Sequence, residues 1–206
     1  ERCPISADLS LSTCVAVGPL AGANPFFHHR MIVVGNWLYL LAAGATNILR
    51  APVAASGDVG TVEIAPVTLP RRQGDGEVVV LGDAVYVLGG QDASTTHGDV
   101  TRALITAPTG ELGPFAKVTV DGATLAMVIP RWGGRSAIVG NYLYVLGGYG
   151  VDRHEHASIN ASGDSGGFVA SGRSTSTGHD DAPILVHGDQ LYIFGGQNSA
   201  STNLKT

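Results

Sequence analysis

Short apolar segments separated by glycine and polar residues recur along the whole chain. In each, an apolar run such as 78–81 is followed by Gly-Asn or Gly-Asp and then by a second apolar run that contains a tyrosine. Glycine followed by Asn or Asp accepts the positive φ that a two-residue hairpin turn requires. Few segments show an apolar repeat of 3.6 residues with capping residues, so the pattern predicts β-hairpins and almost no helix.

This motif, an apolar strand followed by a Gly-Asx turn and a second strand that contains a tyrosine, occurs four times. Its tyrosines, Tyr39, Tyr86, Tyr144 and Tyr192, are spaced by 47, 58 and 48 residues. A repeat of about 50 residues is typical of the blades of some β-propellers. The spacing therefore predicts one structural unit for each tyrosine.

A second sequence motif, a tight turn rich in glycine and acidic residues, lies between these copies. It occurs at 55–62, 107–115 and 161–168, and a degenerate version lies at 7–14. Each such turn is expected to join a third strand to a fourth. Every unit then holds four strands, which is the composition of a propeller blade.

In these residues the chain resembles the kelch-repeat family, in particular its degenerate bacterial arrays, over nearly its whole length. The shared features are the apolar first strand, the tyrosine of the second strand, and Gly-Gly at 89–90, 147–148 and 195–196. The resemblance implies an all-β fold, a β-propeller of four four-stranded kelch-like blades, and implies no function by itself. The departures from the family are Ala42-Ala43 in place of Gly-Gly, and Val62, Phe115, Phe168 and Cys14 in place of the fourth-strand tryptophan.

We expect a single domain over 1–206, with blades at about 28–70, 71–122 and 131–178. The fourth blade is expected to combine 179–206 with 1–20. Strands three and four from the N-terminus would then join strands one and two from the C-terminus, which closes the ring and leaves no unpaired edge. The alternatives are that the chain is one section of a longer array, or that it pairs with a copy of itself.

Cys3 and Cys14 align with residues on the third and fourth strands of the other units, roughly equidistant from the turn between them. Facing residues of antiparallel strands have Cα atoms about 4.5–5.5 Å apart, which suits a disulfide. We predict a Cys3–Cys14 disulfide; the alternative is two buried free thiols. A structural disulfide indicates an oxidising compartment, so we expect a secreted or cell-surface protein.

Composition excludes some partners. The formal net charge is −5, and the only lysines are Lys117 and Lys205. Because the chain has no basic stripe, we expect no nucleic acid and no anionic membrane surface as partner. The apolar stretches are too short to span a bilayer, so no membrane insertion is predicted.

No catalytic residue, metal or cofactor is predicted. Residues 163–167, Gly-Asp-Ser-Gly-Gly, resemble the nucleophile motif of chymotrypsin-like proteases. They also align with the turn at 57–60, which has no serine there, so we interpret them as a turn. His154 and His156 share one face of a predicted strand and are weak candidates for zinc ligands. We interpret that strand as a polar strand facing water.

Ligand binding is expected on one face of the propeller. In the kelch family the connections after Gly-Gly and those between blades gather on one face, and here these connections vary more than the short turns. Variable loops on a rigid scaffold are the usual place of binding, and Trp, Tyr and Arg anchor interfaces or stack on sugars. For Trp132 the alternative is that it covers a junction between blades. The predicted binding residues are Trp132, Arg131, Tyr149, Arg71, Arg72, Gln91, His97 and Arg153.

These observations leave two principal hypotheses. The first is a non-enzymatic extracellular module for binding or adhesion, with a glycan or a protein as partner. The second is a structural subunit of an extracellular fibre or surface repeat array, which contacts copies of itself. A propeller enzyme of the mutarotase or oxidase type is a distant alternative. Both cysteines are accounted for by the predicted disulfide, and nothing in the sequence specifically matches a mutarotase site.

Overall fold

The computed structural model describes residues 3–6, 8, 10–15, 29–41, 44–175, 177–200 and 202–204. In these ranges the chain forms strands and turns, and no helix there is long and apolar enough to cross a membrane. The strands are β1 (Arg30–Val34), β2 (Trp37–Leu41), β3 (Asn47–Pro52), β4 (Glu63–Thr68), β5 (Glu77–Leu81), β6 (Ala84–Leu88), β7 (Val100–Thr106), β8 (Glu111–Leu112), β9 (Ala116–Lys117), β10 (Thr119–Val120), β11 (Ala123–Thr124), β12 (Arg135–Val139), β13 (Tyr142–Leu146), β14 (Arg153–Ile159), β15 (Ser165–Ser174), β16 (Ile184–His187) and β17 (Gln190–Ile193).

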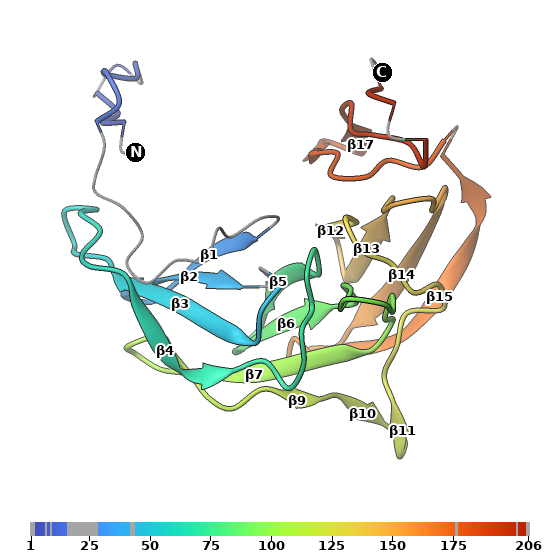
Figure 1. The fold of residues 1–206 in the computed structure, drawn as a ribbon, viewed down its shortest axis with the longest axis horizontal. Coiled ribbons are helices and arrows are strands. Elements are labelled where there is room, and N and C mark those ends of the chain that lie inside the picture. The colour runs from blue at the N-terminus through green and yellow to red at the C-terminus, as the bar shows by residue number, and fades with distance from the viewer. Residues whose placement is uncertain are drawn as a thin grey trace.

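Along the order of each sheet, strands that are consecutive in sequence are antiparallel neighbours (Figure 1). Sheet 1 has the order β1-β2-β3-β4 and sheet 3 the order β12-β13-β14-β15. Sheet 2 has the order β5-β6-β7-β8, and β9 also pairs with β7. The remaining pairs are the small hairpin β10-β11 and the two-stranded sheet β16-β17. The all-β fold and its four hairpins are therefore as the repeat predicts.

The Gly-Asx pairs make the predicted two-residue turns. Gly35, Gly82, Gly140 and Gly188 have φ values of 55°, 55°, 57° and 60°. A side chain is strained in this conformation, and glycine is not. The turn then reverses the chain within two residues, so that Val34 lies opposite Trp37 in the register of the first hairpin.

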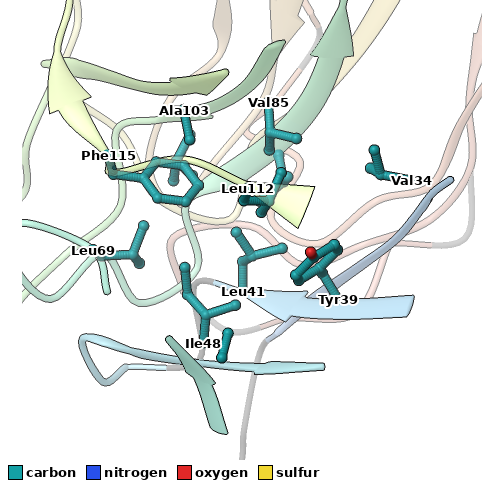
Figure 2. Packing of buried hydrophobic residues seen from close by; sticks show 12 residues of the cluster. Val34, Tyr39, Leu41, Ile48, Leu69, Val85, Ala103, Leu112 and Phe115 are labelled. Carbon is teal, nitrogen blue, oxygen red and sulfur yellow. The ribbon is translucent and has the colours of Figure 1, made fainter. Parts of the chain in front are cut away.

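Successive sheets pack face to face through two apolar layers. The first layer lies between sheets 1 and 2 and includes Tyr39, Leu41, Val85 and Phe115 (Figure 2). The second layer lies between sheets 2 and 3 and repeats it with Tyr86, Leu88, Leu143 and Phe168. Phe115 and Phe168, which occupy equivalent positions in sheets 2 and 3, are both buried. The repeat in sequence is therefore a repeat of one intersheet interface.

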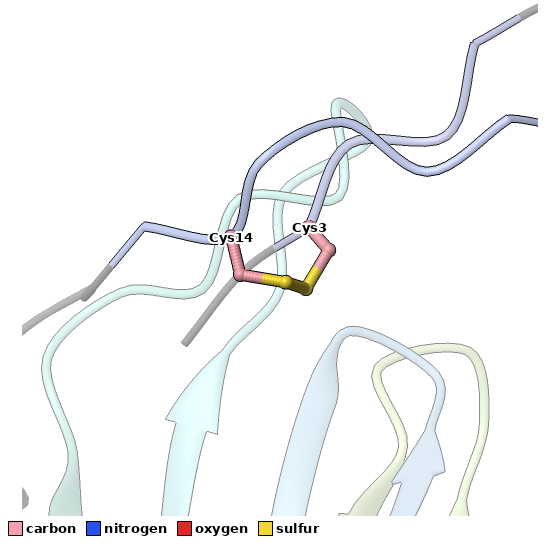
Figure 3. The surroundings of a disulfide bond; sticks show 2 residues. All are labelled: Cys3 and Cys14. Carbon is pink, nitrogen blue, oxygen red and sulfur yellow. A yellow bond between two sulfur atoms is a disulfide. The ribbon is translucent and has the colours of Figure 1, made fainter.

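The predicted ring closure is not formed. The described N-terminal residues make a separate hairpin in which Ile5 pairs with Leu11. Its Cys3–Cys14 disulfide, with Cα atoms 4.1 Å apart, confirms that prediction (Figure 3). Figure 1 shows this disulfide hairpin and the β16-β17 sheet at opposite ends of an open arc of sheets. The apolar layers set the angle between successive sheets, and at this angle the described residues do not complete a ring.

Candidate functional site

A pocket of about 670 Å³ lies among the loops that follow the Gly-Gly pairs. We term it the loop pocket. It combines residues that are far apart in sequence, from the second, third and fourth repeats. Its lining residues are Asp75, Gln91, Trp132, Tyr149, Asp180, Asp181, Gly196, Gln197, Asn203 and Leu204.

Each of the three repeats contributes to the loop pocket in the same way. The residue directly after Gly-Gly is Gln91 in the second repeat, Tyr149 in the third and Gln197 in the fourth. Each pairs through its backbone with the loop that precedes the first strand of its repeat. The N–H groups of Gln91, Tyr149 and Gln197 donate to the carbonyl oxygens of Gly74, Trp132 and Asp180 at 2.8, 3.1 and 3.0 Å. The repeat thus places three equivalent side chains at one opening.

Backbone hydrogen bonds also join the repeats to one another at residues that line the pocket. The N–H of Gly133 donates to the carbonyl of Asp75, and the N–H of Asp181 donates to the carbonyl of Gly133, both at 2.9 Å. These three residues have φ values of 56° (Asp75), 69° (Gly133) and 54° (Asp181). Asp is among the few non-glycine residues that adopt this conformation readily. Main-chain contacts between successive repeats therefore hold Asp75 and Asp181 in the pocket lining.

Trp132 and Tyr149 form the aromatic part of the pocket. Their rings stack with centroids 4.7 Å apart and an interplanar angle of 12°. The Tyr149 hydroxyl donates to the carbonyl of Ser199 at 3.0 Å, which fixes the ring against the C-terminal loop. Tyr149 is still 41% exposed. The pair offers a flat, rigid and accessible apolar surface.

The polar groups of the pocket are mainly acceptors. Its described lining residues include three carboxylates, those of Asp75, Asp180 and Asp181, and no lysine or arginine. Asp75 and Asp180 are largely buried. Asp181 accepts hydrogen bonds from Arg135 at 2.9 Å and from Arg30 at 3.5 Å, and both arginines stand outside the described lining. The pocket therefore presents carboxylates, one of them paired with arginine, beside the side-chain amides of Gln91, Gln197 and Asn203.

The structure brings three of the predicted binding residues together, namely Trp132, Tyr149 and Gln91. It places Arg131 elsewhere. Arg131 is 2% exposed and donates to the Glu155 carboxylate at 2.6 Å and to the Gly147 carbonyl at 2.9 Å. Burial lowers the pKa of Arg131, and the charge of Glu155 opposes that shift. Arg131 holds the loop below the pocket and is not available to a ligand.

The other predicted residues lie outside the pocket lining. Arg71 forms an ion pair with Asp99, and Arg72 donates to the carbonyl of Gly44. His97 lies 2.8 Å from a carboxylate oxygen of Asp92, and Arg153 is exposed at the start of β14. The pocket also contains residues that were not predicted from the sequence. Of these, Gln197 could have been predicted from the sequence, because it follows Gly-Gly directly, as Gln91 does.

The two weaker motifs have ordinary structural surroundings. His156 packs against the rings of Tyr142 and Tyr144, with centroids 5.6 Å away in both cases. In the described part of the chain, no group of three or more His, Cys, Asp or Glu residues could hold a metal ion. Residues 163 and 164 lie in the turn between β14 and β15, as we interpreted them, whereas 165–167 are the first residues of β15. Within it, the Ser165 hydroxyl lies 3.2 Å from the Gly166 carbonyl.

Comparison with known proteins gives a fold and no family. No protein-family model matches the chain, and no curated protein matches it. Among solved structures, YjhT, a β-propeller protein, is similar with a TM-score of 0.64 at 14% sequence identity. The match covers 88% of this chain and 61% of YjhT, so the chain spans less than two thirds of that protein. The similarity shows a β-propeller-like fold.

Proposed function

We propose that this protein is a non-enzymatic saccharide-binding module and that the loop pocket is its binding site. The observation that carries the proposal is the stacked pair of Trp132 and Tyr149 beside carboxylates and side-chain amides. Aromatic faces pack on the C–H face of a sugar ring, while acceptor groups bind its hydroxyls. A concave site of about 670 Å³ fits a small ligand better than the flat surface of a folded protein.

The charge of the pocket selects the class of sugar. A sugar that carries a carboxylate or sulfate would lie beside the carboxylates of Asp75 and Asp180, and beside Asp181, which is paired with Arg30 and Arg135. Like charges at close range cost free energy, most strongly where solvent is excluded. The ligand is therefore a neutral saccharide, or one that bears an amine. This argument also disfavours an enzyme that acts on an acidic sugar.

Two further elements belong to the same proposal. The disulfide is compatible with an oxidising compartment, which supports a secreted or cell-surface location. The disulfide hairpin and the β16-β17 sheet are the two halves of a fourth kelch-like repeat, whose described residues are not joined within this chain. The similarity of the hairpin to the outer turns of the complete sheets supports this assignment.

Binding of neutral and sialylated glycans on an array, followed by calorimetry of the best ligand, tests the proposal. Trp132→Ala removes half of the aromatic surface and is expected to weaken binding about 10- to 100-fold, which is the effect of losing one anchor residue. Tyr149→Phe retains the stack and is expected to bind within about threefold of the native chain, because only the bond to Ser199 is lost. Arg153→Ala, outside the pocket, serves as the matched control. Equal loss in all three variants, or a preference for sialylated glycans, would refute the proposal.

A further inference from the structure

The outer turn of each sheet covers a defined part of the preceding sheet. Gly35 of sheet 1 lies against the backbone of Gly110 in sheet 2, where an added Cβ would be 2.8 Å from the Gly110 Cα. Gly82 of sheet 2 lies in the same way against Gly163 of sheet 3, at 3.1 Å. The tyrosines make a second contact of this kind. Tyr39 donates to the Gly110 carbonyl at 3.1 Å, and Tyr86 donates to the Asp164 carboxylate at 3.3 Å.

Sheet 3 lacks this cover. At Gly140, the equivalent of Gly35 and Gly82, an added Cβ would meet no atom within 4 Å. Tyr144 is only half-buried, whereas Tyr39 and Tyr86 are 1% and 0% exposed. A groove of about 200 Å³ lies between this face and the β16-β17 sheet. Its lining residues are Val139, Tyr144, Val186, Asp189, Gln190 and Leu191.

The edge of β17 along this groove is also unpaired in the described part of the chain. In each complete sheet, the end of the third strand donates a backbone hydrogen bond to the Asx residue of the Gly-Asx turn. These bonds, all 2.7 Å long, are Val53 to Asn36, Ile105 to Asp83 and Ile159 to Asn141. Asp189 is the equivalent acceptor beside β17, and no N–H of the described residues is bonded to its carbonyl in this way.

The direction of the β17 amides follows from its hairpin. Gln190 pairs with His187 across the two-residue turn, so the amides of Gln190 and Tyr192 point toward β16. The amides of Leu191 and Ile193 therefore point to the open edge. A third strand would bond to these two groups.

The disulfide hairpin has the structure of the missing outer turn. The N–H of Ser6 donates to the carbonyl of Ser10 at 2.9 Å, as Ala54 donates to Asp58 at 2.9 Å in sheet 1. A second bond, from Ser12 to Pro4 at 2.8 Å, matches that from Gly60 to Pro52 at 2.8 Å. In sequence, Arg-Cys-Pro at 2–4 matches Arg-Ala-Pro at 50–52. Ile5, the equivalent of Val53, is 68% exposed.

We propose that the groove between sheet 3 and β17 binds the disulfide hairpin of a second copy of this chain. The backbone N–H of Ile5 donates to the carbonyl of Asp189, and Cys3 lies opposite Leu191 as Ala51 lies opposite Leu38 in sheet 1. The mode is addition of β-strands to a sheet edge, which gives affinity through main-chain hydrogen bonds. The inference rests on the proposed assignment of the fourth repeat and does not depend on the loop pocket.

A hairpin supplied by a second copy leaves the observed structure of each chain unchanged. The hairpin of the same chain lies at the far end of the arc from β17 (Figure 1). A hairpin from another copy can reach β17 while this arrangement stays as it is. Because hairpin and groove are different surfaces, the contact is head-to-tail and produces either a closed ring of copies or a filament.

Sedimentation velocity of the full chain over a range of concentrations, with hydrogen exchange of the β17 amides, tests the inference. Ile5→Pro removes the N–H that Asp189 would accept and is expected to weaken self-association about tenfold. Ile5→Val keeps both the N–H and an apolar side chain and should associate as the native chain does. Gly140→Ala places a methyl group on the covered face and should weaken association by a similar factor. Gly122→Ala, a positive-φ glycine with no atom near its added Cβ, is its matched control.

Association that depends on Ile5 and Gly140, with concentration-dependent protection of the Leu191 and Ile193 amides, is the expected result. A monomer in which these amides exchange freely would overturn the inference. A monomer in which they are protected would mean closure within one chain, which also overturns it. Association that survives both Ile5→Pro and Gly140→Ala would assign the contact to another surface. Glycan binding by the loop pocket is measured separately, so the failure of one proposal is distinguishable from that of the other.

Discussion

Replacement of Gly35 by alanine measures how strongly one sheet packs against the next. Two effects oppose the alanine. First, its φ of 55° costs a non-glycine residue about 1–2 kcal/mol. Second, its Cβ would lie 2.6 Å from the Thr109 carbonyl oxygen and 2.8 Å from the Gly110 Cα, both of them backbone atoms that cannot rotate away. Overpacking of this kind costs about 1–3 kcal/mol, so we expect a total loss of about 2–5 kcal/mol.

Gly140→Ala separates the two effects. Gly140 has a φ of 57° in the equivalent turn of sheet 3, and its added Cβ meets no atom within 4 Å. This variant should lose only the conformational part, about 1–2 kcal/mol. Urea unfolding of both variants, followed by circular dichroism at a concentration below that of any self-association, gives the difference. Equal losses in Gly35→Ala and Gly140→Ala would refute the view that the outer turn of sheet 2 is packed on sheet 1.

Three other predictions concern single interactions. Glu155→Ala leaves the Arg131 guanidinium buried without its carboxylate, and we expect a loss of about 3–5 kcal/mol in urea unfolding. Glu63→Ala, which removes a more exposed partner of Arg50, should cost about 0–1 kcal/mol, and losses of similar size in the two variants would contradict this reasoning. The double variant Cys3→Ser/Cys14→Ser should leave the thermal unfolding of sheets 1 to 3 unchanged and abolish self-association in sedimentation, and a lower unfolding temperature would show that the hairpin supports those sheets. The pKa of Asp92 is lowered below its ordinary value of 3.8 by hydrogen bonds from the N–H of Ser94, then from His97, and then from the N–H of Thr95. Because the folded-state pKa is depressed, the stabilisation of the 92–97 loop by these bonds is present above pH 3.8 and is lost as the pH falls below 3.8. An Asp92 carboxylate that titrates by NMR at its ordinary value would contradict these contacts.

Much of the local structure can be predicted from the sequence because it depends on short-range chemistry. The Gly-Asx turns, the tyrosine strands and the disulfide hairpin each follow from residues within about a dozen positions of one another, and all are present in the structure. Trp132 and Tyr149 were each predicted as binding residues because they lie in variable connections, Trp132 between two repeats and Tyr149 directly after Gly-Gly. Arg131 shows the limit of this reasoning. Its residue type suits a binding site, but whether an arginine faces a ligand or a buried Glu155 depends on strands that come together only in the fold.

The sequence by itself determined the repeated unit, the number of copies and the cysteine pairing, because periodicity and turn residues act along the chain. Only the tertiary structure decided that the sheets form an open arc and that Asp75, Asp180 and Asp181 meet at Trp132. The physical reason is that the angle between two sheets depends on many side-chain contacts across the apolar layer between them. No single residue specifies that angle, yet the angle decides whether the sheets form an open arc or a closed ring.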